Sequence, residues 1–194
     1  MKFSLDTLRF AVWRRSLLNC ISAAFLVGLI THAAPARADP TPALNRCRNN
    51  QHADYAEYVT VWGRSGGSMP SGTNPPNILQ TGDAYQVLPY YALSWEHDWV
   101  SIDLWGHRYG PDGNRVPASS GGRFPGLFEF SMVLRFNNNP GGWVGSPVQA
   151  SAFAGCQTWL SSYPIRFLFY VNDTQDWDNG GYWRVLVNIW RAAL

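Results

Sequence analysis

The sequence predicts an all-β protein with a single domain, folded as an antiparallel β-sandwich of jelly-roll type. Three observations predict this class. Short runs of alternating apolar residues recur along the chain, separated by loops rich in Gly, Pro and Asn. After residue 40 no window shows a convincing apolar period of 3.6 residues. The 194 residues include 10 Trp, 9 Tyr and 10 Phe, an aromatic density that excludes a disordered chain.

Residues 1–38 are expected to form a signal peptide. Arg14 and Arg15 precede an apolar run at 21–30, and the Ala-Arg-Ala of 36–38 is a signal-peptidase site. The paired arginines also resemble a twin-arginine export motif, and an ordinary Sec leader is the alternative. Cleavage after Ala38 leaves 156 residues, enough for one domain. We therefore expect a periplasmic or secreted protein.

The charge of the chain depends on this leader. The whole chain carries 15 basic and 13 acidic residues, for a net charge of +2. The part after residue 38 keeps 10 Arg, no Lys and 12 acidic residues, for a net charge of −2. Scattered arginines without lysine argue against a nucleic-acid partner. No later run approaches the roughly 20 apolar residues of a membrane span.

Two cysteines, Cys47 and Cys156, remain after the leader and its Cys20 are removed. An even number in an exported protein is compatible with one disulfide. Two separate thiols are the alternative. Neither cysteine has a nearby His at zinc-ligand spacing, so a structural zinc site is not expected.

Residues 39–57 are polar and contain proline, so we expect a lead-in segment there and a sandwich domain over 58–194. Turn-rich stretches bound each expected strand. The strands are expected at residues 58–62, 84–88, 99–105, 127–136, 165–171 and 182–190.

Alternation along these segments predicts which side chains face the core. In the third strand these are Val100, Ile102 and Leu104. The run 165–171 is apolar at nearly every position, which predicts a central strand covered on both sides. In the fourth and the last strand the expected core positions are Phe128, Phe130, Met132, Leu134 and Phe136, and then Trp183, Val185, Val187 and Ile189.

The segment before the last strand is unusually acidic. Asp173, Asp176 and Asp178 lie within eight positions that also hold Asn172 and Asn179. Crowded carboxylates repel one another unless a cation lies among them, and Ca²⁺ accepts about 6–8 such oxygen ligands. A solvated hairpin loop that uses Asp, Asn and Gly for turn geometry is the alternative.

Several motifs occur in an order that resembles a known family. The chain reads Tyr-x-Asn-Asp at 170–173 and then Asp-Asn-x-Gly-x-Trp-x-Val-x-Val at 178–187. Upstream stand Gly-Asp at 82–83, Trp105 before Gly-Pro-Asp-Gly at 110–113, and Val-Gly-Ser at 144–146. This order is similar to that of the bacterial calcium-dependent galactophilic lectins, the PA-I type.

The resemblance implies a small jelly-roll sandwich that binds Ca²⁺ and, through it, a sugar. Carried over to this chain, it implies Asp173, Asp178 and Asn179 as side-chain ligands of the ion, with a main-chain carbonyl near Trp177. Sugar hydroxyls would complete the shell of the ion, and Asp173 and Asn179 would contact the sugar.

The chain also departs from the family. The loop 173–178 is two residues shorter, and the segment 115–120 lacks the His and Gln that contact galactose in that lectin. Residues 90–98 form an insertion. Galactose specificity is therefore not implied, and the sugar remains open.

Aromatic rings can stack on the apolar faces of pyranose rings. Trp177, Tyr91 and Trp95 are candidates for this contact. Trp183 and Trp105 are instead expected to pack in the core or in a hairpin.

An enzyme would need acid–base or nucleophilic groups. Glu96, His97 and Asp98, with His107, could form a small acid–base or metal site, or simply a polar turn. No Gly-x-Ser-x-Gly motif is present. We therefore expect a non-catalytic, exported, lectin-like protein with a calcium ion and a carbohydrate or glycoconjugate partner. The alternatives are a ligand-free structural or protein-interaction sandwich and a small secreted hydrolase; a homo-oligomer is left open.

Overall fold

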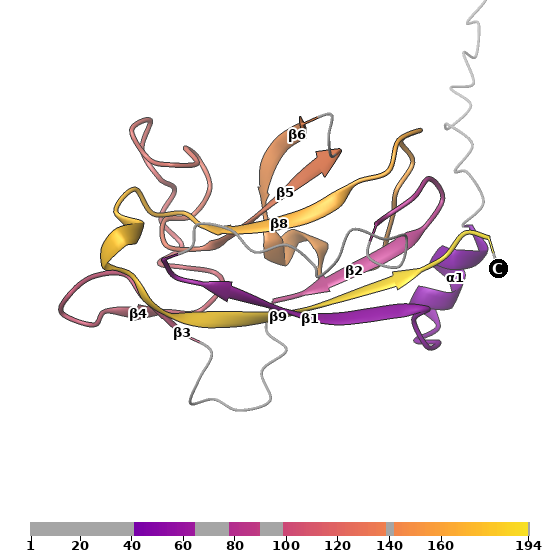
Figure 1. The fold of residues 1–194 in the computed structure, drawn as a ribbon, viewed down its shortest axis with the longest axis horizontal. Coiled ribbons are helices and arrows are strands. Elements are labelled where there is room, and N and C mark those ends of the chain that lie inside the picture. Colours follow the sequence, from indigo (N-terminus) through magenta and orange to yellow (C-terminus); the bar gives the residue numbers. More distant parts are fainter. Residues whose placement is uncertain (1–40, 65–77, 90–98, 139–141, 194) are drawn as a thin grey trace, which may run out of the picture. The chain divides into compact units, whose positions relative to one another are not determined.

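The computed structural model describes residues 41–64, 78–89, 99–138 and 142–193. Within them the chain forms two antiparallel sheets whose inner faces share one core (Figure 1). The all-β sandwich predicted from the sequence is thereby confirmed. The expected signal peptide lies outside the described residues.

The larger sheet is built around its longest strand, β9 (Gly180–Trp190). β1 (Tyr55–Trp62) pairs with β9 over its whole length. The other edge of β9 is shared by β3 (Trp99–Ser101), beside its first residues, and β2 (Ala84–Leu88), beside its last. β4 (Arg108–Tyr109) and β7 (Gln157–Thr158) continue the sheet on either side.

The smaller sheet has the order β6 (Gly142–Gln149), β5 (Met132–Asn138), β8 (Arg166–Val171). The prediction of a central strand covered on both sides at 165–171 is wrong. Among the described strands β8 pairs only with β5, and only every second residue of it is buried. Apolar Leu168 and Tyr170 face outward, where Tyr170 contacts the rings of Phe124 and Trp143. Aromatic neighbours thus explain an apolar run on an edge strand.

The core lies between the sheets, and β9 supplies its centre. The predicted alternation of the last strand is confirmed, because Trp183, Val185, Val187 and Ile189 are all buried. Opposite them stand Phe167 and Phe169 of β8 and Met132 and Leu134 of β5. Burial of this apolar surface is the main force that holds the two sheets together.

Two strands are shorter than predicted because side-chain and backbone geometry ends them. The third stops at Ser101, because the Asp103 carboxylate accepts hydrogen bonds from the backbone N–H groups of Trp105 and His107 and so closes a turn. Leu104, expected to be buried, is exposed in that turn. The fourth begins only at Met132, because Phe130 has a φ of 60°, which breaks the alternation expected from residue 128.

The expected lead-in holds a short helix, α1 (Pro42–Arg48), and β1 begins three residues earlier than predicted. The Thr41 hydroxyl caps α1 by accepting a hydrogen bond from Leu44 N. Seven residues are too few to display a helical period. The expected disulfide is confirmed: Cys47 of α1 bonds to Cys156, just before β7.

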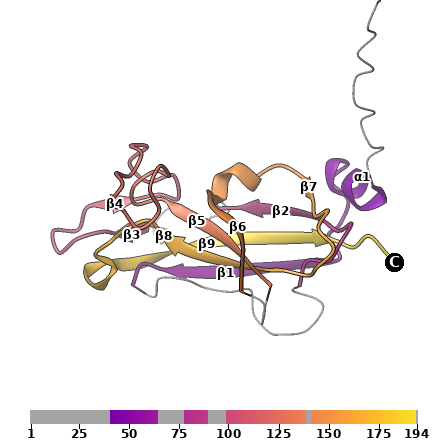
Figure 2. The same cartoon turned by 90° about the horizontal axis from the view of Figure 1, so that it is seen from above.

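The two ends of β9 have different surroundings (Figure 2). Its last residue, Trp190, packs with Ala43 and Cys47 of α1 at the disulfide end. Its first residue follows the acidic segment. No helix in the described part of the chain is long and apolar enough to cross a membrane.

Candidate functional site

The candidate site forms where the chain passes from β8 in one sheet to β9 in the other. Residues 172–179, here called the acidic bend, make this crossing (Figure 1). A single 3₁₀ turn, η3 (Asp176–Asp178), occupies its second half. The acidic bend therefore connects both sheets at one end of the sandwich. A pocket can form at such an end, between the loops of the two sheets.

Asn172 fixes the start of the acidic bend. Its side chain is buried; Oδ1 accepts a hydrogen bond from Phe124 N at 2.9 Å, and Nδ2 is shared among the carbonyls of Phe124, Leu127 and Phe128 at 3.0–3.2 Å. Phe130 N donates to Asn172 O, and Asn172 N donates to Ser131 O. Asn172 is therefore a structural residue that holds the loop 118–130 against the acidic bend.

Gly113 brings a second part of that loop into position. It has a φ of +62°, and a Cβ built there would lie 2.0 Å from Glu129 O. Only glycine fits this close approach. The Gly-Pro-Asp-Gly motif of the sequence thus forms a turn that packs against the backbone of Glu129 and Phe130.

Three buried oxygen atoms of the acidic bend lack a hydrogen-bond partner. They are Asp173 Oδ2, Asp178 Oδ1 and Asn179 Oδ1. The other oxygen of Asp173 accepts from Gln175 N at 2.9 Å, and Asn179 Nδ2 donates to Gly63 O at 3.1 Å. Asp173 is 8% exposed and Asn179 0%. Leaving such groups unpaired costs about 1–3 kcal/mol each, more for a charged one, so these atoms suit a cation.

The electrostatics of Asp173 point the same way. Burial raises the pKa of its carboxyl group, and the charges of Asp178 and Asp176 raise it further, against the opposing effect of the Gln175 N–H and the Asn179 amide. Asp176 is itself paired with Arg123, whose Nη1 lies 2.8 Å from its Oδ2. Negative charge at Asp173 and Asp178 is thus the charge that a cation would balance.

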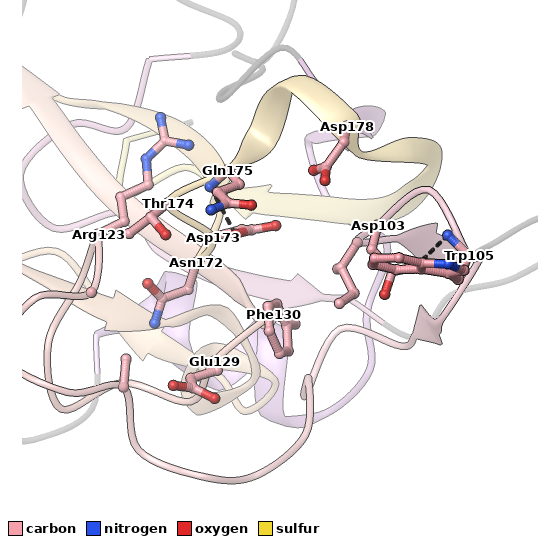
Figure 3. Close-up of a pocket in the computed structure, with 13 residues that line it drawn as sticks. Asp103, Trp105, Arg123, Glu129, Phe130, Asn172, Asp173, Thr174, Gln175 and Asp178 are labelled. Atoms are coloured by element: carbon pink, nitrogen blue, oxygen red, sulfur yellow. Dashed lines mark hydrogen bonds between the residues drawn. The ribbon is translucent and has the colours of Figure 1, made fainter.

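A pocket of about 330 Å³ opens beside these atoms (Figure 3). One wall is the acidic bend, with Asp173 and Asp178. A second is the turn after β3, and a third is the loop 118–130. The second and third walls include Ile102, Asp103, Trp105, Arg123, Glu129 and Phe130.

The tryptophans near the pocket are Trp105 and Trp177. Trp105, expected to pack in the core or a hairpin, is 85% exposed and lines the pocket. That prediction is wrong for Trp105 and confirmed for Trp183. Trp177, expected at the ligand, lies in η3 and is 65% exposed, and it is not one of the residues that line this pocket. Asp103 and Gly106, which flank Trp105 in a turn, are the sequence signal that could have indicated its exposure.

Of the candidate acid–base site predicted from the sequence, the structure describes only His107. His107 Nδ1 bonds to Asp103, which holds the pKa of that carboxyl group below its usual value. Glu96 and His97 lie outside the described residues, as do Tyr91 and Trp95. The remaining His107–Asp103 pair shapes the turn that carries Trp105.

The donor set at the acidic bend includes an amide as well as carboxylates. In the described part of the chain, no three His, Cys, Asp or Glu side chains gather closely enough to hold a metal ion by themselves. An ion at the acidic bend would therefore rely on Asn179 Oδ1 and main-chain carbonyls beside Asp173 and Asp178. Oxygen donors of this mixture are the kind that Ca²⁺ accepts.

Comparison with known proteins gives no family for this chain. No family model matches it, and no curated protein matches its sequence. The resemblance to calcium-dependent lectins therefore stays a prediction from the order of motifs, and the site has to be judged on its own geometry.

Proposed function

We propose that the protein is an exported, non-catalytic, carbohydrate-binding sandwich that uses a calcium ion at the acidic bend. The observation that carries the proposal is the set of three buried oxygen atoms without hydrogen-bond partners, on Asp173, Asp178 and Asn179. These are the side chains that the motif order suggested as ligands, and they lie in one bend beside a pocket.

The choice of Ca²⁺ follows from the donors. Carboxylate, amide and carbonyl oxygens are hard ligands, whereas no thiol or imidazole of the described residues lines this pocket. A bend fixed at one end by Asn172 and containing a 3₁₀ turn suits the irregular shell of Ca²⁺ better than the strict octahedron of Mg²⁺.

The sugar would bind at the same place. A bound Ca²⁺ would offer open coordination positions to two neighbouring hydroxyl groups of a sugar. Asp173, which lines the pocket, would orient those hydroxyl groups by accepting hydrogen bonds from them, whereas the fully buried Asn179 would bind the ion. Export is supported by the leader motifs in the sequence and by the Cys47–Cys156 disulfide, since such bonds persist in oxidising compartments.

Calorimetric titration of Ca²⁺ into the purified protein tests the proposal. Asp173→Asn keeps the shape of the side chain and removes its charge. We expect it to weaken Ca²⁺ binding at least tenfold, about 1.4 kcal/mol or more. Asp112→Asn is the matched control, because it makes the same charge change in a surface pair with Arg115. No Ca²⁺ binding by the wild type, or equal weakening by both variants, would contradict the site.

A glycan array then tests the ligand. The wild type should bind carbohydrate with Ca²⁺ and lose it with a chelator, whereas Asp173→Asn should bind little under either condition. Ca²⁺ binding without any bound glycan would favour the structural or protein-interaction alternative.

A further inference from the structure

We propose that the indole of Trp105 is the platform on which the sugar ring stacks, and that it makes the site selective for pyranose rings over open-chain polyols. The inference rests on the proposed function and adds to it the class of ligand and the residue that selects it.

Trp105 contributes little to the fold. Its side chain is 85% exposed, the largest exposed fraction among the large apolar side chains described. An indole exposed to water is unfavourable, because the protein does not gain the free energy that burial of its apolar surface would provide. A ligand that covers this ring would recover that energy, so the residue fits a role in binding better than one in stability.

The main chain that carries the indole is nevertheless held in place. Asp103 Oδ1 accepts hydrogen bonds from Trp105 N at 3.0 Å and from His107 N at 3.1 Å. Ile102 N donates to His107 O at 3.0 Å, which closes the base of the turn. A binding residue whose backbone is already ordered loses less entropy when its ligand arrives.

The position of the ring matches the two-sided chemistry of a pyranose. Trp105 shares the pocket with the carboxylates of Asp173 and Asp178 (Figure 3). A sugar ring has hydroxyl groups around its edge and an apolar C–H face. Hydroxyl groups directed to the acidic bend would leave that face free for the indole. An open-chain polyol has the hydroxyl groups but lacks the rigid apolar face.

The size of the pocket suits a ligand of one ring. Its volume of about 330 Å³ is at the small end of ligand pockets, which span roughly 300–1,000 Å³. Glu129 and Phe130 close it on the side of the loop 118–130. We therefore expect terminal or single pyranose units to bind, with any further residues of a glycan outside the pocket.

Other exposed tryptophans lack this combination. Trp62 packs against the ring of Tyr182. The guanidinium of Arg135 covers the ring of Trp143, with 3.7 Å between Cζ of Arg135 and the ring centroid. Trp177 lies in the acidic bend and is exposed, yet it does not line the pocket. Trp177 is thus the matched control: a nearby indole of similar exposure outside the cavity.

The test uses calorimetry of the Ca²⁺-loaded full chain with two sets of probes: methyl pyranosides of galactose, glucose, mannose and fucose, and the alditols galactitol, sorbitol and mannitol. For the pyranoside that binds best, Trp105→Ala should weaken binding at least tenfold, whereas Trp105→Phe should recover part of it. Trp177→Ala should change it less than twofold. The preference of the wild type for pyranosides over alditols should disappear in Trp105→Ala.

Two further measurements, the Ca²⁺ affinity and the melting temperature, distinguish a failure of the stacking role from a failure of the proposed function. The Ca²⁺ affinity and the melting temperature of Trp105→Ala should match those of the wild type, because Trp105 is 85% exposed, is not part of the core and supplies no oxygen ligand from its side chain. If wild-type protein binds Ca²⁺ and a pyranoside but Trp105→Ala binds both equally well, the stacking role is wrong and the proposed function stands. The same holds if Trp177→Ala causes the loss instead. If the wild type binds no pyranoside, both inferences fall.

Discussion

Asp173 is expected to affect both the proposed ion binding and stability. The features that suit its carboxylate to an ion also lower the unfolding free energy of the ion-free protein. Its Oδ2 is buried without a hydrogen-bond partner, and burial together with Asp178 and Asp176 raises the pKa of its carboxyl group. The folded protein therefore holds the Asp173 proton more tightly than the unfolded chain does. Consequently this residue lowers the stability of the ion-free protein as pH rises from the ordinary carboxyl pKa of 3.8 through the raised folded value.

Asp173→Asn should therefore stabilise the ion-free protein at pH 7, by roughly 1 kcal/mol, while it weakens Ca²⁺ binding. In chelator the melting temperature of the variant should exceed that of the wild type at pH 7, and the difference should shrink to nothing near pH 3.5. The comparison of the two proteins cancels other titrating groups. A variant less stable than the wild type at pH 7 would show that the carboxylate is satisfied without an ion.

At the scale of single residues, the sequence groups side chains that are neighbours in the chain, and their role as ion ligands stays a prediction. Asp173, Asp178 and Asn179 fall in one bend, so their spacing was enough to group them. Trp105 could not be assigned in the same way. Its exposure depends on the turn that Asp103 closes, and its place at the pocket depends on the packing of that turn beside the acidic bend.

At the scale of elements, the strands with a strict apolar alternation were the predictable ones. β2 and β9 begin and end close to their expected residues, because each has one buried face. β3 and β5 are shorter than predicted, since a local turn closed by Asp103 ends β3 and the positive φ of Phe130 delays the start of β5. β8 lies where the sequence predicts a strand, but its expected cover on both sides is wrong, because an apolar run looks alike whether aromatic side chains or a second layer cover it.

The disulfide joins two elements and should act on stability alone. Cys47 and Cys156 close a loop with a sequence separation of 109, and their bond pins α1 beside β2, β7 and the end of β9. Replacing both cysteines by alanine should cost about 2–5 kcal/mol of unfolding free energy. Urea unfolding measures this difference.

Ca²⁺ binding by the folded double variant should stay within twofold of the wild type. The disulfide lies at the end of β9 and the acidic bend at its start, and the 11 residues of this strand span about 35 Å. A large loss of Ca²⁺ affinity in the double variant would mean that the two ends of the sandwich are coupled.

At the scale of the whole molecule, the acidic bend is one of the places where the chain crosses between the two sheets, beside the connections β4 to β5, β6 to β7 and β7 to β8. It leaves β8 of the smaller sheet and enters β9, the centre of the larger one, and its Asn172 also holds the loop 118–130. The sequence could predict a sandwich, since that requires only the pattern of strands. Which strand ends meet at the pocket depends on the pairing of β3 with β9, which no local pattern contains.

An ion bound at this link should therefore stabilise the entire sandwich rather than one loop. A ligand present at about 100 times its Kd adds about 2.7 kcal/mol to the unfolding free energy. For a domain of this size that corresponds to a rise of about 5–10 °C in melting temperature. We expect this rise with Ca²⁺ and a smaller one with Mg²⁺ at the same concentration, because Mg²⁺ demands a stricter geometry.

Amide hydrogen exchange would locate the effect. Ca²⁺ should slow exchange most over residues 171–181, and Asp173→Asn should abolish both the slowing and the rise in melting temperature. Asp112→Asn should preserve them, because Asp112 pairs with Arg115 at the surface. If Ca²⁺ raised the melting temperature of Asp173→Asn as much as that of the wild type, the stabilising ion would bind elsewhere. The acidic bend would then be a crossing between sheets and nothing more.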